Sequence, residues 1–355
     1  MGKEDNSTFI PGQEVIAGFF SRTVFTGGYR QTEGGTRPPL FFYYKEKLPN
    51  LFLFISFMQP KTCLSMRANV HTTIKSLLNE KLTQLEANLD SDIFCYYGAI
   101  MDGLENDILA IIEELSNDAA KRDRLTIILT TPGGSAFAVE RYVNIVRHHY
   151  TTVDFIIPDS AYSAGTIFCM SGDNIYMDYS SVLGPIDPQV QNKEGKWVAA
   201  LGYLDKVNDA IAKSVAGTLS EAEFLMVKDL DLSELRSYEQ AKELTNDLLK
   251  KWLVQYKFKN WTTHQTTPAL IGQSVTAQEK VAKAEEIANS LNDSGKWKSH
   301  GRPIHIDDLV KIGLKIEDYS KNNTLRNLIR EYYQLLNDFI NQNKLPIFVH
   351  TRKFI

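Results

Sequence analysis

The chain has 355 residues, 43% of them hydrophobic, and a formal net charge of −4 at pH 7. This length suits one large domain or two ordinary ones, and the negative balance argues against a general nucleic-acid-binding surface. The longest apolar run, residues 51–58, falls far short of the roughly 20 residues that a membrane span needs. The charged N-terminus also lacks the apolar core of a signal peptide. We therefore expect a soluble, cytoplasmic protein with no transmembrane segment.

Residues 1–65 are predicted to form a partly irregular N-terminal extension, because "GGYRQTEGGTRPPL" is rich in glycine and proline. A helix is predicted over residues 69–89, where apolar side chains recur at spacings of three and four. Its apolar residues are Val70, Ile74, Leu77, Leu78, Leu82 and Leu85.

Residues 92–189 alternate between strand and helix patterns. "DIFCYYGAI" reads as a strand, "ENDILAIIEELSND" as an amphipathic helix, and "RLTIILTTPGG" as a strand buried on both faces. "SAFAVERYVNIVRHHY" is helical again, and "VDFIIPDSAYSAGTIFCMSGDNIYMD" repeats strand, turn, helix and strand. This order predicts an α/β fold with a mostly parallel sheet and right-handed crossovers.

The rest of the chain is predicted to be mostly helical, with a helical insertion at about residues 217–298 and Ser274 or Thr276 as N-cap of its last helix. "HGRPIHIDDLVKIGLKI" then reads as a short strand and a helix that ends at Gly313. A helix and a basic tail are expected over residues 321–355.

Neither cysteines nor histidines show the spacing of metal ligands, so we expect no metal site and no cofactor. Cys63, Cys95 and Cys169 are scattered without a CxxC pair and are predicted to be reduced thiols that pack as small hydrophobic residues. Six histidines are interpreted as surface or packing residues: His71, His148, His149, His264, His305 and His350.

The stretch from Pro132 to Ser135, "PGGS", joins a predicted strand to a predicted helix. Glycines there permit positive φ and close approach of another group, and the helix directs free N–H groups toward the turn. A phosphate-binding loop is not favoured, because neither GxxxxGK[ST] nor GxGxxG is present. An oxyanion hole and a plain tight turn both remain open.

A second turn, "AYSAG", places Ser163 between small residues at the start of the next helix. The helix dipole favours developing negative charge there, which suits a nucleophile, although serine is also a preferred N-cap. Parallel strands end at one sheet edge, so the two turns are expected to lie side by side. One would offer a hydroxyl and the other N–H donors, and such donors contribute a factor of about 100 to 1,000 in rate.

"TTPGGSAFAVERYV" and "AYSAGTIFCMSGDNIYMDYSSVLGPIDPQ" resemble the Clp/crotonase-fold serine peptidases, which include the Clp protease proteolytic subunit and signal peptide peptidase A. The resemblance is most specific to the serine dehydrogenase proteinase family, and "GRPIHIDDLVKIGLKIED" resembles its closing unit. It covers roughly residues 92–319. It implies a spiral of ββα units within a peptidase domain over residues 66–320, a polypeptide substrate and a self-associating particle.

The resemblance also implies roles for individual residues. Ser163 matches the nucleophile, and the N–H groups of Gly134 and Ala164 match the oxyanion hole. Tyr162 departs from the smaller residue of some relatives and is expected to alter the shape of the pocket. Asp187 stands where the Clp subunit has its catalytic histidine, so the usual triad is not expected, and we interpret this Asp between prolines as a turn residue.

The general base is predicted from the relatives that use a lysine on a later helix. Lys206 and Lys213 lie seven residues apart and share one helix face. Lys206 is the leading candidate, because apolar Leu204 and Val207 beside it would favour a neutral lysine. His300 is the alternative base, since histidine readily exchanges protons near neutral pH. Solvated lysines and a structural histidine are the corresponding non-catalytic interpretations.

These features predict a serine peptidase that works through an acyl-enzyme on Ser163 without ATP. One alternative is a crotonase-type enzyme, in which the same oxyanion hole would stabilise the enolate of an acyl thioester. Another is a catalytically inactive assembly protein of Clp fold, suggested by the missing histidine at Asp187.

Overall fold

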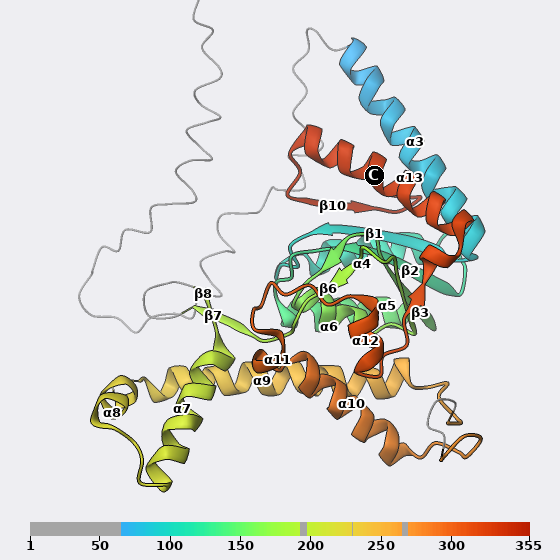
Figure 1. The fold of residues 1–355 in the computed structure, drawn as a ribbon. Helices are drawn as coiled ribbons and strands as arrows, with labels where there is room; N and C mark the ends of the chain where they lie inside the picture. The colour runs from blue at the N-terminus through green and yellow to red at the C-terminus, as the bar shows by residue number, and fades with distance from the viewer. Residues whose placement is uncertain (1–64, 192–196, 229, 265–268) are drawn as a thin grey trace, which may run out of the picture. The chain divides into compact units, whose positions relative to one another are not determined.

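A computed structural model describes residues 65–191, 197–228, 230–264 and 269–355 (Figure 1). The N-terminal extension expected over residues 1–65 lies outside these ranges except for its last residue, as does Cys63. Among the described helices, none combines the length and apolar character required to cross a bilayer.

A six-stranded sheet forms the centre of the described structure, in the order β10-β1-β2-β3-β5-β9. Neighbouring strands run parallel except for β10, which pairs antiparallel with β1. The mostly parallel α/β sheet predicted from the sequence is thereby confirmed. The strands are β1 Asp92–Gly98, β2 Arg124–Thr130, β3 Thr152–Ile157, β5 Asn174–Met177, β9 Glu317–Asp318 and β10 Ile347–His350.

Both faces of the sheet are buried, because successive side chains of each strand point to opposite faces. Phe94 and Tyr96 of β1 enter one hydrophobic cluster, whereas Ile93 and Cys95 enter another. The first cluster includes α4 Glu105–Ser116, α5 Ala136–His149 and α6 Ala164–Met170. The second includes α3 Ser65–Leu89 and α13 Asn323–Asn343 (Figure 1). This double burial explains the nearly continuous apolar runs of the strands.

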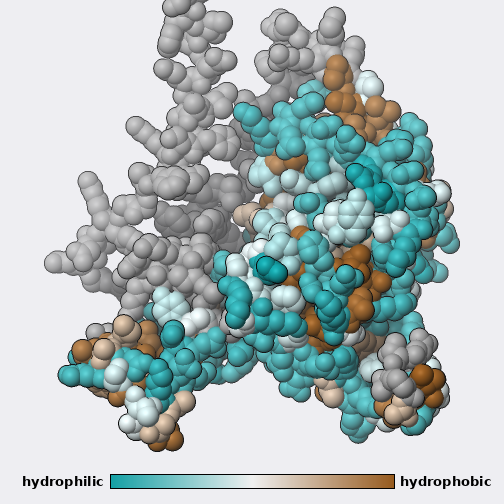
Figure 2. All heavy atoms as spheres, viewed as in Figure 1, coloured by the Kyte–Doolittle hydropathy of each residue, from teal (hydrophilic) through white to brown (hydrophobic). Residues whose placement is uncertain are grey.

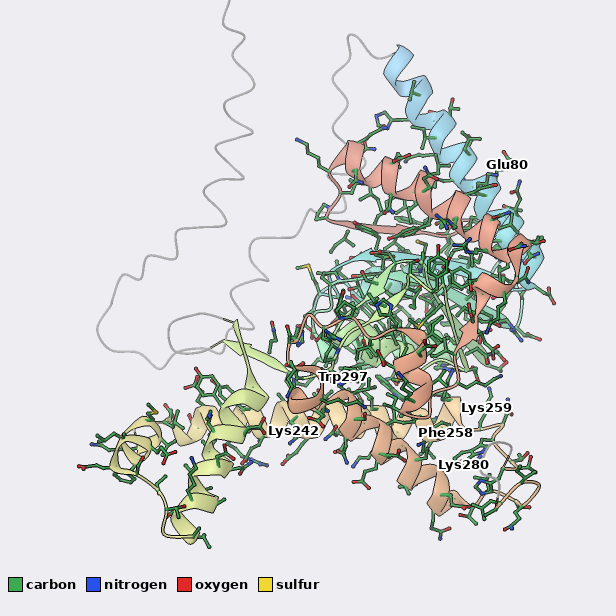
Figure 3. The ribbon with its side chains drawn as sticks, viewed as in Figure 1. Glu80, Lys242, Phe258, Lys259, Lys280 and Trp297 are labelled. Atoms are coloured by element: carbon green, nitrogen blue, oxygen red, sulfur yellow. The ribbon has the colours of Figure 1, made fainter. Side chains whose placement is uncertain are left out.

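The insertion after the sheet region is helical, as its amphipathic pattern predicted. Trp252 and Leu249 of α9 join the first cluster. Lys280 Nζ donates to the carbonyls of Phe258 at 2.6 Å and Lys259 at 3.3 Å, which ties α10 to the end of the π-helical turn η2 (Figure 3). Thr276 caps α10 in a capping box. The elements are α9 Leu232–Trp252, η2 Leu253–Lys257, α10 Ala277–Leu291, α11 Ser294–Trp297 and α12 Ile306–Lys311.

Two helices, α7 Ala200–Val215 and α8 Glu221–Lys228, form what we call the arm. A hairpin of β7 Gln189–Gln191 and β8 Trp197–Ala199 leads into it. The arm is joined to α9 through a small hydrophobic cluster centred on Ala200, Leu204 and Tyr238.

The helix expected within residues 321–355 is present as α13, and the tail that follows it adds strand β10 to the sheet. They follow the short 3-10 turn η3 Tyr319–Lys321. Helix α13 packs against α3, and β10 pairs with β1. Arg352 forms ion pairs with the buried carboxylates of Glu86 at 2.8 Å and Asp92 at 2.7 Å. Arg352, a basic residue of the predicted tail, therefore pairs with buried carboxylates.

Candidate active site

A second, small sheet lies at the carboxyl edge of the large one and positions the two glycine-containing turns. It consists of β4 Ser160–Ala161 and β6 Val182–Leu183, which run parallel. The N–H of Thr131 donates to the carbonyl of Ser160 at 3.0 Å, and the N–H of Tyr162 donates to the carbonyl of Thr131 at 3.0 Å. These bonds join the end of β2 to the segment that carries Ser163.

The two turns are in direct contact. A Cβ atom placed on Gly133 would lie 2.9 Å from both Ser163 Cβ and the carbonyl oxygen of Tyr162. Gly133 has a φ of 106°, which further favours glycine. The expectation that both turns lie side by side is thus met by a contact that leaves no room for a side chain at Gly133.

Gly134 holds the first candidate oxyanion donor. Its φ is 144°, and a Cβ there would lie 2.0 Å from the carbonyl oxygen of Ile100. The adjoining strand contact uses its neighbours: Ile100 N–H donates to Gly133 O, and Ser135 N–H donates to Ile100 O, each at 2.9 Å. The N–H of Gly134 takes no part in this contact and has no acceptor among the described residues.

Ser163 occupies a strained backbone position directly before α6. Its φ is 51° and ψ is −116°, a conformation that side-chain-bearing residues seldom adopt and that recurs at functional sites. Ser163 stands at the N-cap position of α6, but its half-buried side chain makes no capping hydrogen bond. Ser135, by contrast, caps α5 by accepting from Ala138 N–H at 3.2 Å.

Ala164 holds the second candidate donor, because it is the first residue of α6 and its N–H lacks an intrahelical acceptor. No described residue accepts this hydrogen. Two free amides, of Gly134 and Ala164, therefore belong to two turns that touch at Ser163. A negatively charged oxygen is the kind of group that such donors stabilise.

Tyr162 packs against the segment that follows β6. A Cβ on Gly184 would lie 2.4 Å from Tyr162 Cδ1 and 3.0 Å from its Cα. The Thr166 hydroxyl lies 2.9 Å from the carbonyl of Ala161 and 2.8 Å from that of Gly184, which braces the same segment. The position of the Tyr162 ring thus requires glycine at position 184, because a side chain there would clash with the ring.

Asp187 and His300 form a hydrogen-bonded pair that sequence reasoning missed. Asp187 Oδ1 lies 2.9 Å from His300 Nδ1. The Asp187 side chain is 6% exposed and that of His300 is 21% exposed. The interpretation of Asp187 as a mere turn residue therefore requires correction. The 113 residues between the partners hid the pair, and the only sequence signal was a His just before the closing strand-helix unit.

The candidate lysines lie on the arm. Leu204 is buried, as expected, but Lys206 itself is exposed, so the expected desolvation of Lys206 is not seen in this chain. Lys213 is exposed and forms an ion pair with Glu223, which raises the pKa of Lys213. A raised pKa disfavours the neutral amine that a base requires. The role of Lys206 as a base remains a prediction.

In the described ranges, no group of three or more His, Cys, Asp or Glu side chains is arranged to hold a metal ion. Cys95 and Cys169 are buried, unbridged thiols. Burial raises the pKa of Cys95 to about 12 and also raises that of Cys169. Both are therefore held as neutral thiols at physiological pH, which makes them poor nucleophiles.

Comparison with known proteins finds a family that resembles the part of the chain that carries Ser163. Residues 100–270 match the ClpP-like SDH-type serine proteinases. This part of the chain is therefore similar to that family. The SDH-type match includes Gly134, Ser163, Ala164 and Asp187, whereas His300 lies beyond it. The resemblance expected from the two turns is confirmed.

Individual relatives match only part of the chain. An uncharacterised protein of Methanocaldococcus jannaschii is 28% identical over 214 residues, covering 60% of this chain and 56% of the relative. A second uncharacterised protein of that organism is 31% identical over 149 residues, covering 39% and 50%. The chain spans about half the length of these curated relatives. A solved membrane-bound stomatin-specific protease, in complex with a substrate peptide, is 22% identical with a TM-score of 0.26, covering 39% of this chain and 68% of that one.

Proposed function

We propose that this protein is a serine peptidase that hydrolyses peptide bonds through an acyl-enzyme on Ser163. The observation that carries the proposal is the strained, uncapped Ser163 in contact with a turn whose Gly134 amide is free, as is that of Ala164. A hydroxyl and backbone N–H donors are the groups that acyl transfer requires. The SDH-type serine proteinase match over residues 100–270 supports a peptide substrate.

In this reaction Ser163 Oγ attacks the carbonyl carbon of the scissile peptide bond. The carbonyl oxygen becomes an oxyanion that the N–H groups of Gly134 and Ala164 stabilise. The Ser163 hydroxyl proton is transferred to the amine as the carbon–nitrogen bond breaks, and water then hydrolyses the acyl-enzyme and restores the Ser163 hydroxyl. None of these steps consumes ATP. We further propose that the protein self-associates, as relatives of the Clp fold are expected to do.

The test is labelling with a fluorophosphonate probe together with cleavage of casein or a peptide library. We expect wild type to be labelled and to cleave, and Ser163→Ala to lose both activities. Ser160→Ala is the matched control, because this serine lies in the same segment and, among the described residues, its hydroxyl bonds only to Asp159. Absence of label on folded wild type would contradict the peptidase and favour the crotonase-type or inactive alternatives.

A further inference from the structure

A cavity of about 370 Å³ lies between helix α13 and the carboxyl ends of strands β3 and β5, and its size is that of a ligand site. Pro158 and Ser180 line it from the strand ends, and Arg330, Tyr333 and Asn337 line it from α13. We propose that the cavity is a subsite of the peptidase, in which Arg330 binds a carboxylate of the substrate polypeptide several residues from the scissile bond. This inference rests on the proposed peptidase function and adds a preference for acidic substrates to it.

The cavity lies at the sheet edge that carries the nucleophile. The Thr130 hydroxyl donates to the Tyr333 hydroxyl at 3.2 Å, and Thr130 is the last residue of β2 before the turn that contains Gly134. On the other wall, Pro158 stands five residues before Ser163, so their Cα atoms lie within roughly 19 Å of each other. About six residues of extended polypeptide span that distance. A substrate whose scissile bond meets Ser163 therefore reaches the cavity with residues on one side of that bond.

Arg330 supplies the charge that selects a carboxylate. Its side chain is exposed and pairs with no acid in the described part of the chain. The buried Asp178 also lines the cavity, but Arg326 already forms an ion pair with it at 2.8 Å. Asp338, the other acid of the lining, follows Arg330 by eight residues, which is about 12 Å along the helix axis. The end of the cavity at Arg330 is therefore basic, and an unpaired guanidinium binds a carboxylate through two parallel hydrogen bonds.

Side-chain amides continue the same face of α13. Gln334 and Asn337 line the cavity and follow Arg330 by four and seven residues, a spacing that keeps all three on one side of the helix. An amide donates and accepts hydrogen bonds, as does each peptide group of an extended chain. Burial raises the pKa of Tyr333 to about 12, so this hydroxyl stays neutral and repels no anion. The lining thus suits a polypeptide backbone with one carboxylate placed at Arg330.

The experiment uses a peptide that the full-length wild type cleaves, resynthesised with one Glu or one Gln at successive positions on either side of the scissile bond. We expect a position within about six residues of that bond at which Glu lowers KM relative to Gln. Arg330→Gln should raise KM for this Glu peptide by about 5- to 10-fold and remove the preference. Arg330→Glu should reverse the preference in favour of Lys at the same position.

Lys344→Gln is the matched control, because this exposed lysine at the end of α13 lies outside the cavity. It should keep the preference for Glu. A purely structural role of Arg330 would affect Glu and Gln peptides alike, whereas recognition of a carboxylate separates them. Each peptide is compared as a free C-terminal acid and as an amide. A preference for the free acid alone identifies the chain terminus as the carboxylate, and a preference for internal Glu identifies a side chain; Arg330→Gln should remove either.

Equal KM values for Glu and Gln peptides at every position and with either C-terminus would overturn the subsite. So would a preference that Arg330→Gln retains or that Lys344→Gln also loses. Fluorophosphonate labelling of Ser163 in the same proteins keeps this failure distinct from failure of the proposed function, because wild type that the probe does not label would remove the peptidase itself.

Discussion

Gly134 and Gly103 lie in neighbouring loops and share a positive φ, of 144° and 98°, yet they differ in their surroundings. A Cβ on Gly134 would meet the backbone of Ile100 at 2.0 Å, whereas a Cβ on Gly103 has nothing within 4 Å. An alanine at either position would have a strained backbone conformation, but only at position 134 would the loop also have to move to make room for the Cβ atom. This difference separates the cost of backbone strain from the cost of displacing the proposed oxyanion donor.

Gly134→Ala should therefore lower kcat for peptide cleavage by about 100- to 1,000-fold, because a displaced loop carries the Gly134 amide with it. Gly103→Ala should keep kcat near wild type while losing roughly 1–2 kcal/mol of stability to strain. Cleavage kinetics and urea unfolding of both variants measure the two effects. Equal loss of kcat in both variants would show that the Gly134 amide has no particular role.

At the scale of residues, the sequence was sufficient to predict that the turns of Gly134 and Ser163 lie together, because each turn follows the end of a strand. The turns containing Gly134 and Ser163 follow neighbouring parallel strands, and parallel strands end at one edge. Asp187 and His300 could not be paired in the same way, because helices α7 to α11 lie between them. The resemblance did not supply the pairing either, because this chain has Asp187 where the Clp subunit has its histidine, and the structure places His300 against that aspartate.

Secondary-structure elements were predicted where apolar residues recur at a regular spacing over many residues, and they were missed where that pattern is short. Helix α3 begins at Ser65 and ends at Leu89, close to the predicted 69–89. Strand β10 has only four residues, too few for an alternating pattern of apolar and polar residues to be recognised. It pairs with β1, which lies far from it in the sequence. Tertiary contacts, not local propensity, determine this strand.

His350 at the end of β10 makes sheet stability depend on pH. It is fully buried between the Tyr332 hydroxyl at 2.9 Å and Asn79 Oδ1 at 2.8 Å. Burial, with a contribution from nearby Lys75, lowers the pKa of His350 to about 3. The unfolded chain takes up a proton below its ordinary pKa of about 6.5, but the folded chain does not. The stabilisation is therefore complete above pH 6.5 and is lost progressively as the pH falls toward 3.

We expect this residue to remove about 2 kcal/mol from the free energy of unfolding between pH 6.5 and pH 5, since each unit contributes about 1.4 kcal/mol. His350→Asn should be less stable than wild type at pH 7.5 but should lose less stability on acidification. Urea unfolding at pH 7.5 and pH 5 measures both values. The exposed His305→Asn is the control and should keep the wild-type difference; an equal difference in His350→Asn would contradict the prediction.

At the scale of the whole molecule, the arm exposes apolar side chains that nothing in the described part of a single chain covers. Large apolar side chains gather on α7 and α8 and remain exposed, and Figure 2 shows hydrophobic residues over this region. Exposed patches of this kind mark interaction surfaces. The exposed fractions are 57% for Ile211, 86% for Val215, 51% for Phe224, 54% for Leu225 and 78% for Met226. We propose that a second copy of the chain covers the arm.

The double variant Val215→Glu, Met226→Glu should therefore shift the protein to a smaller species, because an interface would have to bury two unpaired carboxylates. Val281→Glu is the matched control, since this valine of α10 is also exposed, at 49%, and lies outside the arm. Sedimentation velocity measures the mass of each species, and circular dichroism verifies that the helices persist. A double variant that sediments like wild type would show that the arm is not the contact between copies. Because Lys206 lies on the same arm, a smaller species that still cleaves peptides at the wild-type rate would also argue against any need for a partner to desolvate that lysine.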